Sequence, residues 1–176
     1  GRDDDPEALI TYARFAVRTG DQDLAARLLE RILEREPENN GAALLFAQVL
    51  QKQDKTARAL EYLERVLADN PDNLRLRTAY ARLLVDAKRY GAALAEFERL
   101  LERAPDNGDV RFAHALLLLQ TNRHDEARAA FEALLDDPDR TLTAHYYLGQ
   151  IAEVDEARER ALEHYRQVAR GQHYLD

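Results

Sequence analysis

The chain repeats itself every 34 residues, and this period constrains its fold more than any other feature. Pro37, Pro71 and Pro105 stand 34 residues apart, each within a short stretch rich in Asp and Asn. Small residues recur at the same interval in two series, which are Ala13, Ala47, Ala81, Ala115 and Gly149, and then Ala25, Ala59, Ala93, Ala127 and Ala161. Large apolar residues form two more series, which are Leu29, Leu63, Phe97, Phe131 and Tyr165, and then Ile32, Val66, Leu100, Leu134 and Val168. Because independent series share one period, we predict five repeats.

Each repeat is expected to form two helices, because its apolar residues fall at helical spacing, as in Leu24, Leu28 and Ile32. The predicted helices cover residues 6–19, 22–36, 40–53, 56–69, 73–87, 90–103, 107–121, 124–136, 140–154 and 157–170. Capping side chains are expected at helix starts, namely Asp21, Asn40, Asn73 and Asn107. Arg35 and Arg103 stand near predicted helix ends, where positive charge is favoured.

This pattern resembles the tetratricopeptide repeat (TPR) family, which has small residues at positions eight and twenty and a large residue at position twenty-four. All five copies have these three features. The resemblance implies an all-α fold, a right-handed α-solenoid of about five helix-turn-helix units. We expect a single array over residues 1–176, a fragment of a longer array, with repeats at about 6–39, 40–73, 74–107, 108–141 and 142–175.

Two positions depart from the family pattern. The fourth position, which is usually large and apolar, holds Leu9, Ala43, Arg77, Arg111 and His145. The turn within each unit, where the family favours Gly, holds Gly20, Asp54, Lys88, Asn122 and Glu156. Because Lys88 and Glu156 rarely adopt a left-handed conformation, we expect irregular turns at these two residues.

A second resemblance is narrower. Residues 75–101 and 144–176 resemble repeats of bacterial outer-membrane TPR lipoproteins, which are adaptors of a periplasmic carboxyl-terminal processing protease and its substrates. This resemblance implies that the chain presents substrates to such a protease. It would place the protein in the bacterial periplasm, attached to the outer membrane, in preference to the cytoplasm.

Composition argues against several classes of function. A net charge of −8 argues against a general nucleic-acid binder. The absence of Cys and Ser removes cysteine metal sites and both common nucleophiles. No apolar run approaches the roughly 20 residues of a membrane span, so we expect no membrane insertion by this segment. The five His residues form no metal-binding sequence motif, and we expect no enzymatic activity, catalytic residue, metal or cofactor.

The TPR resemblance implies that the first helix of each unit lines a concave face. Four side chains on the predicted first helices of the last two repeats form what we call the apolar patch, namely Phe112, Leu116, Leu119 and Tyr146. Phe112 and Tyr146 occupy equivalent positions one repeat apart, so we favour anchors for a protein or peptide partner. The alternative is that Leu116 and Leu119 complete the core of a helix pair.

Arginines stand at concave positions of the first and third repeats, namely Arg14, Arg18, Arg75 and Arg82. Taken alone, they are best explained as solvated side chains. Beside apolar anchors they could orient a partner through its carboxylates. The function that we predict is an interaction scaffold or adaptor whose concave groove holds a partner, with Arg14, Arg75 and Arg82 as orienting donors.

Two further hypotheses remain open. In one, the array is a structural spacer or oligomerisation segment with an empty groove. Self-association would then use an uncapped C-terminal edge around Tyr165, Val168 and Leu175. In the other, the array is a regulatory domain attached to an enzyme that lies outside this sequence.

Overall fold

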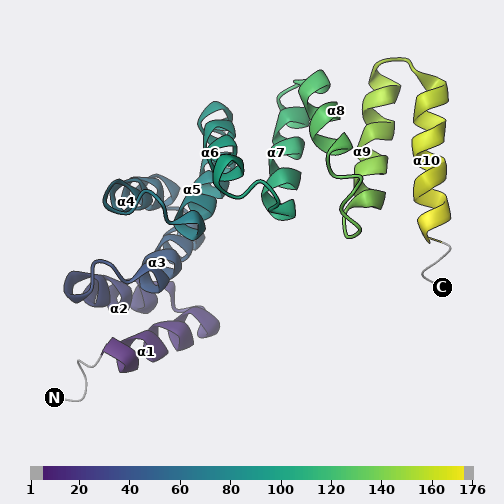
Figure 1. Ribbon diagram of the computed structural model, residues 1–176. Helices are drawn as coiled ribbons and strands as arrows, with labels where there is room; N and C mark the ends of the chain where they lie inside the picture. Colours follow the sequence, from purple (N-terminus) through teal and green to yellow (C-terminus); the bar gives the residue numbers. More distant parts are fainter. Residues whose placement is uncertain (1–5, 173–176) are drawn as a thin grey trace. The chain divides into compact units, whose positions relative to one another are not determined.

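A computed structural model describes residues 6–172, and within this range the chain forms ten α-helices packed as sequential pairs (Figure 1). The helices are α1 (Pro6–Thr19), α2 (Gln22–Arg35), α3 (Asn40–Lys52), α4 (Thr56–Asp69), α5 (Leu74–Asp86), α6 (Tyr90–Arg103), α7 (Gly108–Gln120), α8 (His124–Glu132), α9 (Thr141–Val154) and α10 (Arg158–Gln172). The predicted all-α fold of about five helix pairs is confirmed. None of these helices combines the length and the apolarity that a membrane span requires.

The chain divides into two compact units, unit 1 (Gly1–Glu96) and unit 2 (Phe97–Asp176). In unit 1, each of α1 to α4 packs against the next helix along the chain, and in unit 2 the same holds for α7 to α9. The small residues of both repeat series are buried in each unit, where they let neighbouring helices approach closely. Among the large residues, Val66, Tyr165 and Val168 are half-buried and the others are buried.

One predicted helix is too long. The sequence predicts a helix over residues 124–136, whereas α8 ends at Glu132. Beyond α8 the backbone tightens, because the N–H of Leu134 donates to the carbonyl of Phe131 at 3.0 Å and that of Leu135 to Glu132 at 3.1 Å. These bonds span three residues instead of four, as at many helix ends.

The capping residues are confirmed with one correction. Asp21, Asn73 and Asn107 each accept a hydrogen bond from the backbone N–H three residues later. At α3 the cap is Asn39 and not Asn40, because the Asn39 side chain accepts from the N–H of Ala42 at 3.0 Å. Neighbouring asparagines carry the same sequence signal, and the backbone geometry chooses between them.

The expectation of irregular turns at Lys88 and Glu156 is wrong. All five turns within the units have a residue at positive φ, with 57° at both Lys88 and Glu156 and 84° at Gly20. In each turn the next N–H donates to a carbonyl five residues back, as from Arg89 to Leu84 at 2.8 Å. This bond pattern ends the first helix and compensates the cost of a side chain in the left-handed region.

The polar residues at the fourth repeat position find partners. The Arg77 guanidinium pairs with the carboxylate of Glu96 at 2.5 Å, and Nδ1 of His145 lies 3.0 Å from Nδ1 of His164. Both pairs link the first helix of a repeat to the second and join residues 19 apart. Arg111 instead donates to Asp106 at 3.2 Å. The departures from the family pattern are therefore structurally compensated.

The histidine pair predicts a pH dependence of stability. Burial and the neighbouring His164 lower the pKa of His145 below its ordinary value of 6.5. The unfolded chain therefore binds a proton more readily, so the pair's stabilisation is complete above that value and is lost as the pH falls below it. We expect the free energy of unfolding, from urea titrations, to fall between about pH 7.5 and 5.5, where His is the main titrating side chain.

The variant His145→Gln isolates this contribution. Burial also lowers the pKa of His114, which the variant retains. We therefore expect a smaller loss of stability on acidification in His145→Gln than in the wild type. Equal losses in the two proteins would contradict the assignment.

Candidate functional site

The apolar patch of unit 2 lies beside an aromatic cluster built by α7, α8 and α9. Phe131 is fully buried and stacks on Tyr147 with ring centroids 4.9 Å apart and an interplanar angle of 14°. Phe112 meets Phe131 edge to face at 6.3 Å and Tyr147 at 6.0 Å. Such edge and stacked contacts add to the apolar burial and fix the rings. Phe112 is therefore half-buried, less exposed than the predicted anchor role assumes.

Tyr146 is the member of the apolar patch that presents its ring to solvent, with 45% of its surface exposed. Its ring lies 5.3 Å from that of Tyr147 in a T-shaped contact and 6.3 Å from that of Tyr165. Its hydroxyl accepts a hydrogen bond from the Gln150 amide at 3.0 Å. Neighbours in α9 and α10 thus support this exposed ring.

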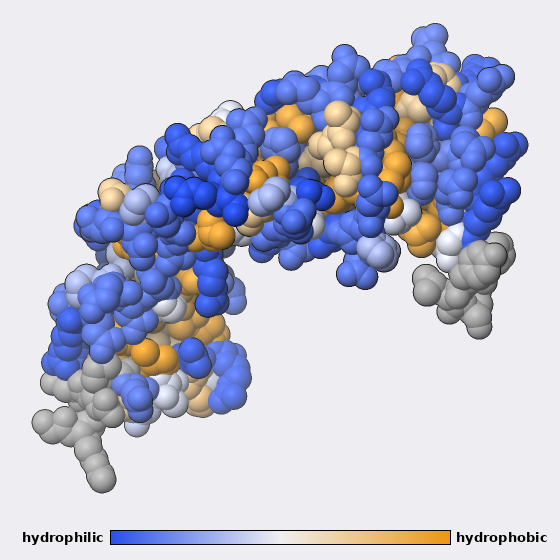
Figure 2. All heavy atoms as spheres, in the orientation of Figure 1, coloured by the Kyte–Doolittle hydropathy of each residue, from blue (hydrophilic) through white to orange (hydrophobic). Residues whose placement is uncertain are grey.

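The other two predicted anchors, Leu116 and Leu119, are half-buried on α7. Figure 2 shows a face of the molecule on which hydrophilic side chains predominate and apolar ones gather in separate groups between them. Because they are half-buried, Leu116 and Leu119 can contribute both to the core and to a surface. Their half-buried state is compatible with each of the two roles considered for them from the sequence.

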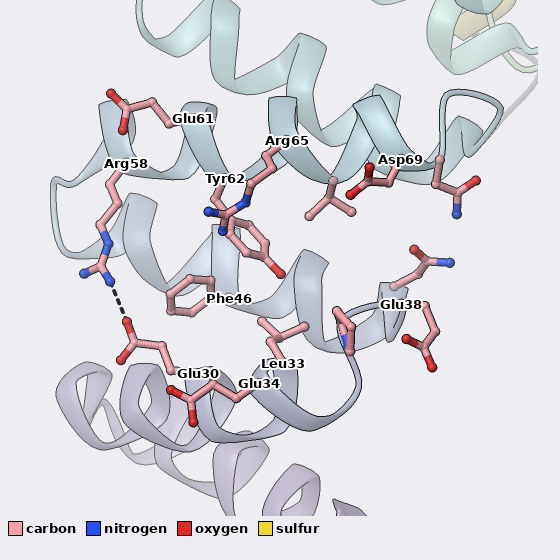
Figure 3. A pocket seen from close by; sticks show the side chains of 14 residues that line it. Glu30, Leu33, Glu34, Glu38, Phe46, Arg58, Glu61, Tyr62, Arg65 and Asp69 are labelled. Carbon is pink, nitrogen blue, oxygen red and sulfur yellow. Dashed lines mark hydrogen bonds and ion pairs between the residues drawn. The ribbon is translucent and has the colours of Figure 1, made fainter.

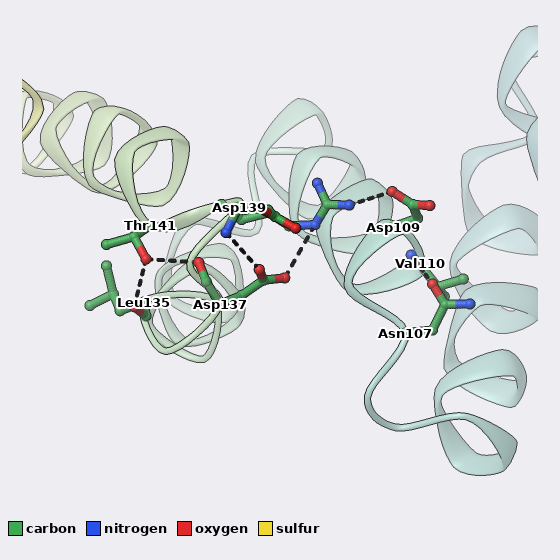
Figure 4. Close-up of polar contacts among 8 residues, drawn as sticks. Asn107, Asp109, Val110, Leu135, Asp137, Asp139 and Thr141 are labelled. Carbon is green, nitrogen blue, oxygen red and sulfur yellow. Dashed lines mark hydrogen bonds and ion pairs between the residues drawn. The ribbon is translucent and has the colours of Figure 1, made fainter. Parts of the chain in front are cut away.

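Arg140 is a polar neighbour of the patch that sequence reasoning missed. Its guanidinium pairs with Asp109 and with Asp137, the latter at 3.4 Å (Figure 4). It also lies 5.8 Å from the ring centroid of Phe112. The hydroxyl of Thr141 donates to the carbonyls of Leu135 and Asp137 in the same loop. Arg140 and Asp109 are 31 positions apart in the sequence, so no local spacing predicts their contact.

The predicted orienting arginines belong to unit 1. Arg14 lies on α1, and Arg75 and Arg82 lie on α5, and all three are exposed. Within residues 6–172 none of the three has an ion-pair partner. The apolar patch belongs to unit 2, so the arginines and the apolar side chains form surfaces of different units.

Unit 1 also contains a cleft of about 800 Å³, which sequence reasoning missed because it considered the first helices alone. The cleft lies between α2 and α4, the second helices of the first two repeats, and Phe46 of α3 reaches it as well (Figure 3). Its lining residues are Glu30, Leu33, Glu34, Pro37, Glu38, Asn40, Phe46, Arg58, Glu61, Tyr62, Arg65, Val66, Asp69 and Asn70. We call it the α2–α4 cleft.

Metal-ligating side chains are sparse in the described part of the chain. Within residues 6–172, no three His, Asp or Glu side chains are grouped so that they could hold a metal ion. The His145 and His164 rings, which the sequence did not pair, share a hydrogen bond across α9 and α10. One ring nitrogen donates and the other accepts, which orients both rings.

Two sequence families match parts of the chain. Residues 84–151 match the family described as tetratricopeptide repeat, and residues 18–100 match the family described as anaphase-promoting complex, cyclosome, subunit 3. Among curated proteins, none matches the sequence. Neither family description names an adaptor of a processing protease, so that hypothesis rests on the sequence resemblance alone.

Several solved structures of MamA proteins share the fold. MamA from Desulfovibrio magneticus RS-1 has a TM-score of 0.83 and 18% sequence identity over 97% of each chain. MamA MSR-1 has a TM-score of 0.77 and 23% identity, covering 97% of this chain and 98% of that one. MamA AMB-1 has a TM-score of 0.72 and 26% identity, covering 93% and 96% respectively. These likenesses, together with the repeat match, identify the fold as a TPR scaffold.

Proposed function

We propose that this chain, a TPR repeat protein structurally similar to MamA, is an interaction scaffold that binds a protein partner through the apolar patch of unit 2. The anchors are Phe112, Leu116, Leu119 and Tyr146. The observation that carries the proposal is Tyr146, an exposed aromatic ring held by contacts with Tyr147 and Tyr165. A ring fixed before binding loses little conformational entropy on binding, which is the property of an effective anchor.

Aromatic side chains dominate the energetics of protein interfaces because they bury a large apolar area and offer a polar tip. The Tyr146 hydroxyl is such a tip. Arg14, Arg75 and Arg82 are proposed as orienting donors on unit 1. We also propose that the partner binds in a concave groove.

The finer hypothesis concerns the class of partner. Presentation of substrates to an envelope protease is supported by the resemblance of residues 75–101 and 144–176 to TPR lipoprotein adaptors. An envelope location is supported by the same resemblance. The protease role and the envelope location both stay predictions. They are tested by comparing the partners recovered from envelope and cytosolic extracts.

The test is a pull-down from envelope and cytosolic extracts of the source organism with the wild type, Tyr146→Asp and Leu24→Asp as baits. We expect Tyr146→Asp to recover at least about tenfold less partner, because hot-spot residues contribute about 2 kcal/mol or more. Leu24→Asp is the matched control, since Leu24 is an exposed leucine on α2, a second helix of unit 1. Equal recovery by all three baits would contradict the proposal.

The alternative of self-association is favoured by a different observation. Leu162 is 55% exposed, whereas the equivalent Leu60 and Leu94 of earlier repeats are buried. Tyr165 and Val168 of the proposed edge are half-buried, and Leu175 lies outside the described residues. If this edge joins two copies, the mass in sedimentation rises with concentration in the wild type and not in Leu162→Asp.

A further inference from the structure

The α2–α4 cleft of unit 1 combines an apolar floor with a charged rim. Phe46 and Tyr62 meet edge to face in the cleft, with ring centroids 5.1 Å apart and an interplanar angle of 85°. Leu33 of α2 and Val66 of α4 line the cleft beside them and are half-buried. Figure 3 shows the two rings between the wall helices. Phe46 is itself buried, so Tyr62, Leu33 and Val66 supply the aromatic and aliphatic surface that an incoming side chain can contact.

The rim of the cleft carries an excess of negative charge. Five carboxylates line the cleft, those of Glu30, Glu34, Glu38, Glu61 and Asp69. Two guanidiniums line it as well, those of Arg58 and Arg65, so the cleft carries a net charge of −3.

The two arginines are already engaged. Arg58 pairs with Glu30 across the cleft and lies 5.8 Å from the ring centroid of Phe46. Arg65 lies 5.5 Å from that of Tyr62. Among residues 6–172, Glu34, Glu38, Glu61 and Asp69 have no ion-pair partner. Arg58 therefore offsets Glu30, and the charge of Arg65 offsets only one of the other four carboxylates, so an excess of negative charge surrounds the apolar floor.

We propose that the α2–α4 cleft is a second binding site, which takes a basic segment of a partner protein with Arg or Lys side chains beside an apolar side chain. The apolar side chain would contact the floor, and the cations would pair with the rim carboxylates. The half-buried Tyr62 ring already lies beside the Arg65 guanidinium, so it suits the aliphatic stem and planar head of a further arginine.

The chemistry of the rim decides between classes of ligand. An acidic peptide or a nucleic acid would meet a net charge of −3 and be repelled. A volume of about 800 Å³ lies within the usual range of ligand sites, so the cleft suits a few side chains of a short segment. This site lies on second helices of unit 1, whereas the proposed patch for the first partner belongs to unit 2.

The probe is a short fluorescein-labelled peptide in which arginines alternate with leucines and glycines, and fluorescence anisotropy reports its binding to the full chain. A matched peptide has glutamate in place of every arginine. We expect the arginine peptide alone to bind, with an affinity that falls as salt is added, because exposed ion pairs are screened.

Two double variants locate the binding. Glu34→Lys with Glu61→Lys reverses two rim charges, and we expect the peptide to bind at least about tenfold more weakly. Glu64→Lys with Glu132→Lys changes the net charge equally at exposed residues outside the cleft, and we expect less than about threefold weakening. The replaced residues are exposed, so both variants are expected to keep the helical circular dichroism of the wild type.

Three results would overturn the inference. They are an absence of binding by the arginine peptide, equal binding of the glutamate peptide, and equal weakening in the two double variants. Tyr146→Asp should bind the peptide as the wild type does, so failure of the α2–α4 cleft and failure of the apolar patch are distinguishable.

Discussion

Replacing Phe131 with alanine is expected to lower the free energy of unfolding of unit 2 by about 3–5 kcal/mol, the usual range for a buried aromatic ring. Phe131 has none of its surface exposed and touches the rings of Phe112 and Tyr147. The substitution removes these contacts and leaves a cavity where α7, α8 and α9 meet. Because helices of a repeat protein contact mainly their neighbours, the loss should be local to unit 2.

Urea unfolding followed by circular dichroism measures this effect in the full chain, with Phe131→Leu as the control. Leucine is the residue at the equivalent position of the first two repeats, Leu29 and Leu63, so it should cost clearly less than alanine. A loss below about 1 kcal/mol for Phe131→Ala is typical of exposed sites and would contradict the packing described here.

Replacing Glu96 with leucine is expected to cost about 3 kcal/mol, because it leaves the Arg77 guanidinium without its charged partner in a site of limited solvent access. Glu96 is 7% exposed, and the Arg77 side chain is 16% exposed. Arg77 also donates to the carbonyl of Pro71, which keeps one of its hydrogen bonds and holds the cost at the lower end of the range for buried ion pairs.

The double variant Arg77→Leu with Glu96→Leu should recover most of that loss. Well-packed apolar residues often replace a buried ion pair at little cost. The first repeat already shows this arrangement, because its equivalent residues are Leu9 and Leu28. Unfolding titrations of the two single variants and the double variant close a thermodynamic cycle. If the double variant is as unstable as the sum of the singles, the two residues do not form the pair described here.

The helix bounds and the buried series could be predicted because the period of 34 residues places equivalent side chains in equivalent environments. A small residue such as Ala81 is buried wherever the two helices of a unit approach, and one copy informs the other four. The end of α8 departs from this regularity, because hydrogen bonds that span three residues follow Glu132 where the second helices of earlier repeats continue.

The polar pairs could not be predicted from the sequence pattern. Arg77 and His145 are polar residues at the fourth repeat position, which is usually apolar. Their role is clear only when the residue 19 positions later is considered. Glu96 and His164 stand at that later position and face them from the second helix. The prediction of irregular turns at Lys88 and Glu156 failed for a related reason. The hydrogen bonds of the whole turn outweigh the conformational preference of a single residue.

The candidate site could be predicted only in part. Equivalent positions of Phe112 and Tyr146 suggested equal exposure, yet Phe112 is covered by Phe131 and Tyr147 while Tyr146 is exposed. The α2–α4 cleft was missed because its lining comes mainly from two second helices, with further residues from α3 and the segments between the helices. Each of these residues alone resembles an ordinary surface or core residue.

Site-specific photo-crosslinking tests the central claim most directly. The photoreactive residue p-benzoylphenylalanine replaces Tyr146 on α9 in one protein and exposed Arg160 on α10 in another. We predict that a partner protein is crosslinked from position 146 and not from position 160, and that excess wild-type protein suppresses the product. Crosslinks from position 160 alone, or equally from both positions, would contradict a partner site at the apolar patch.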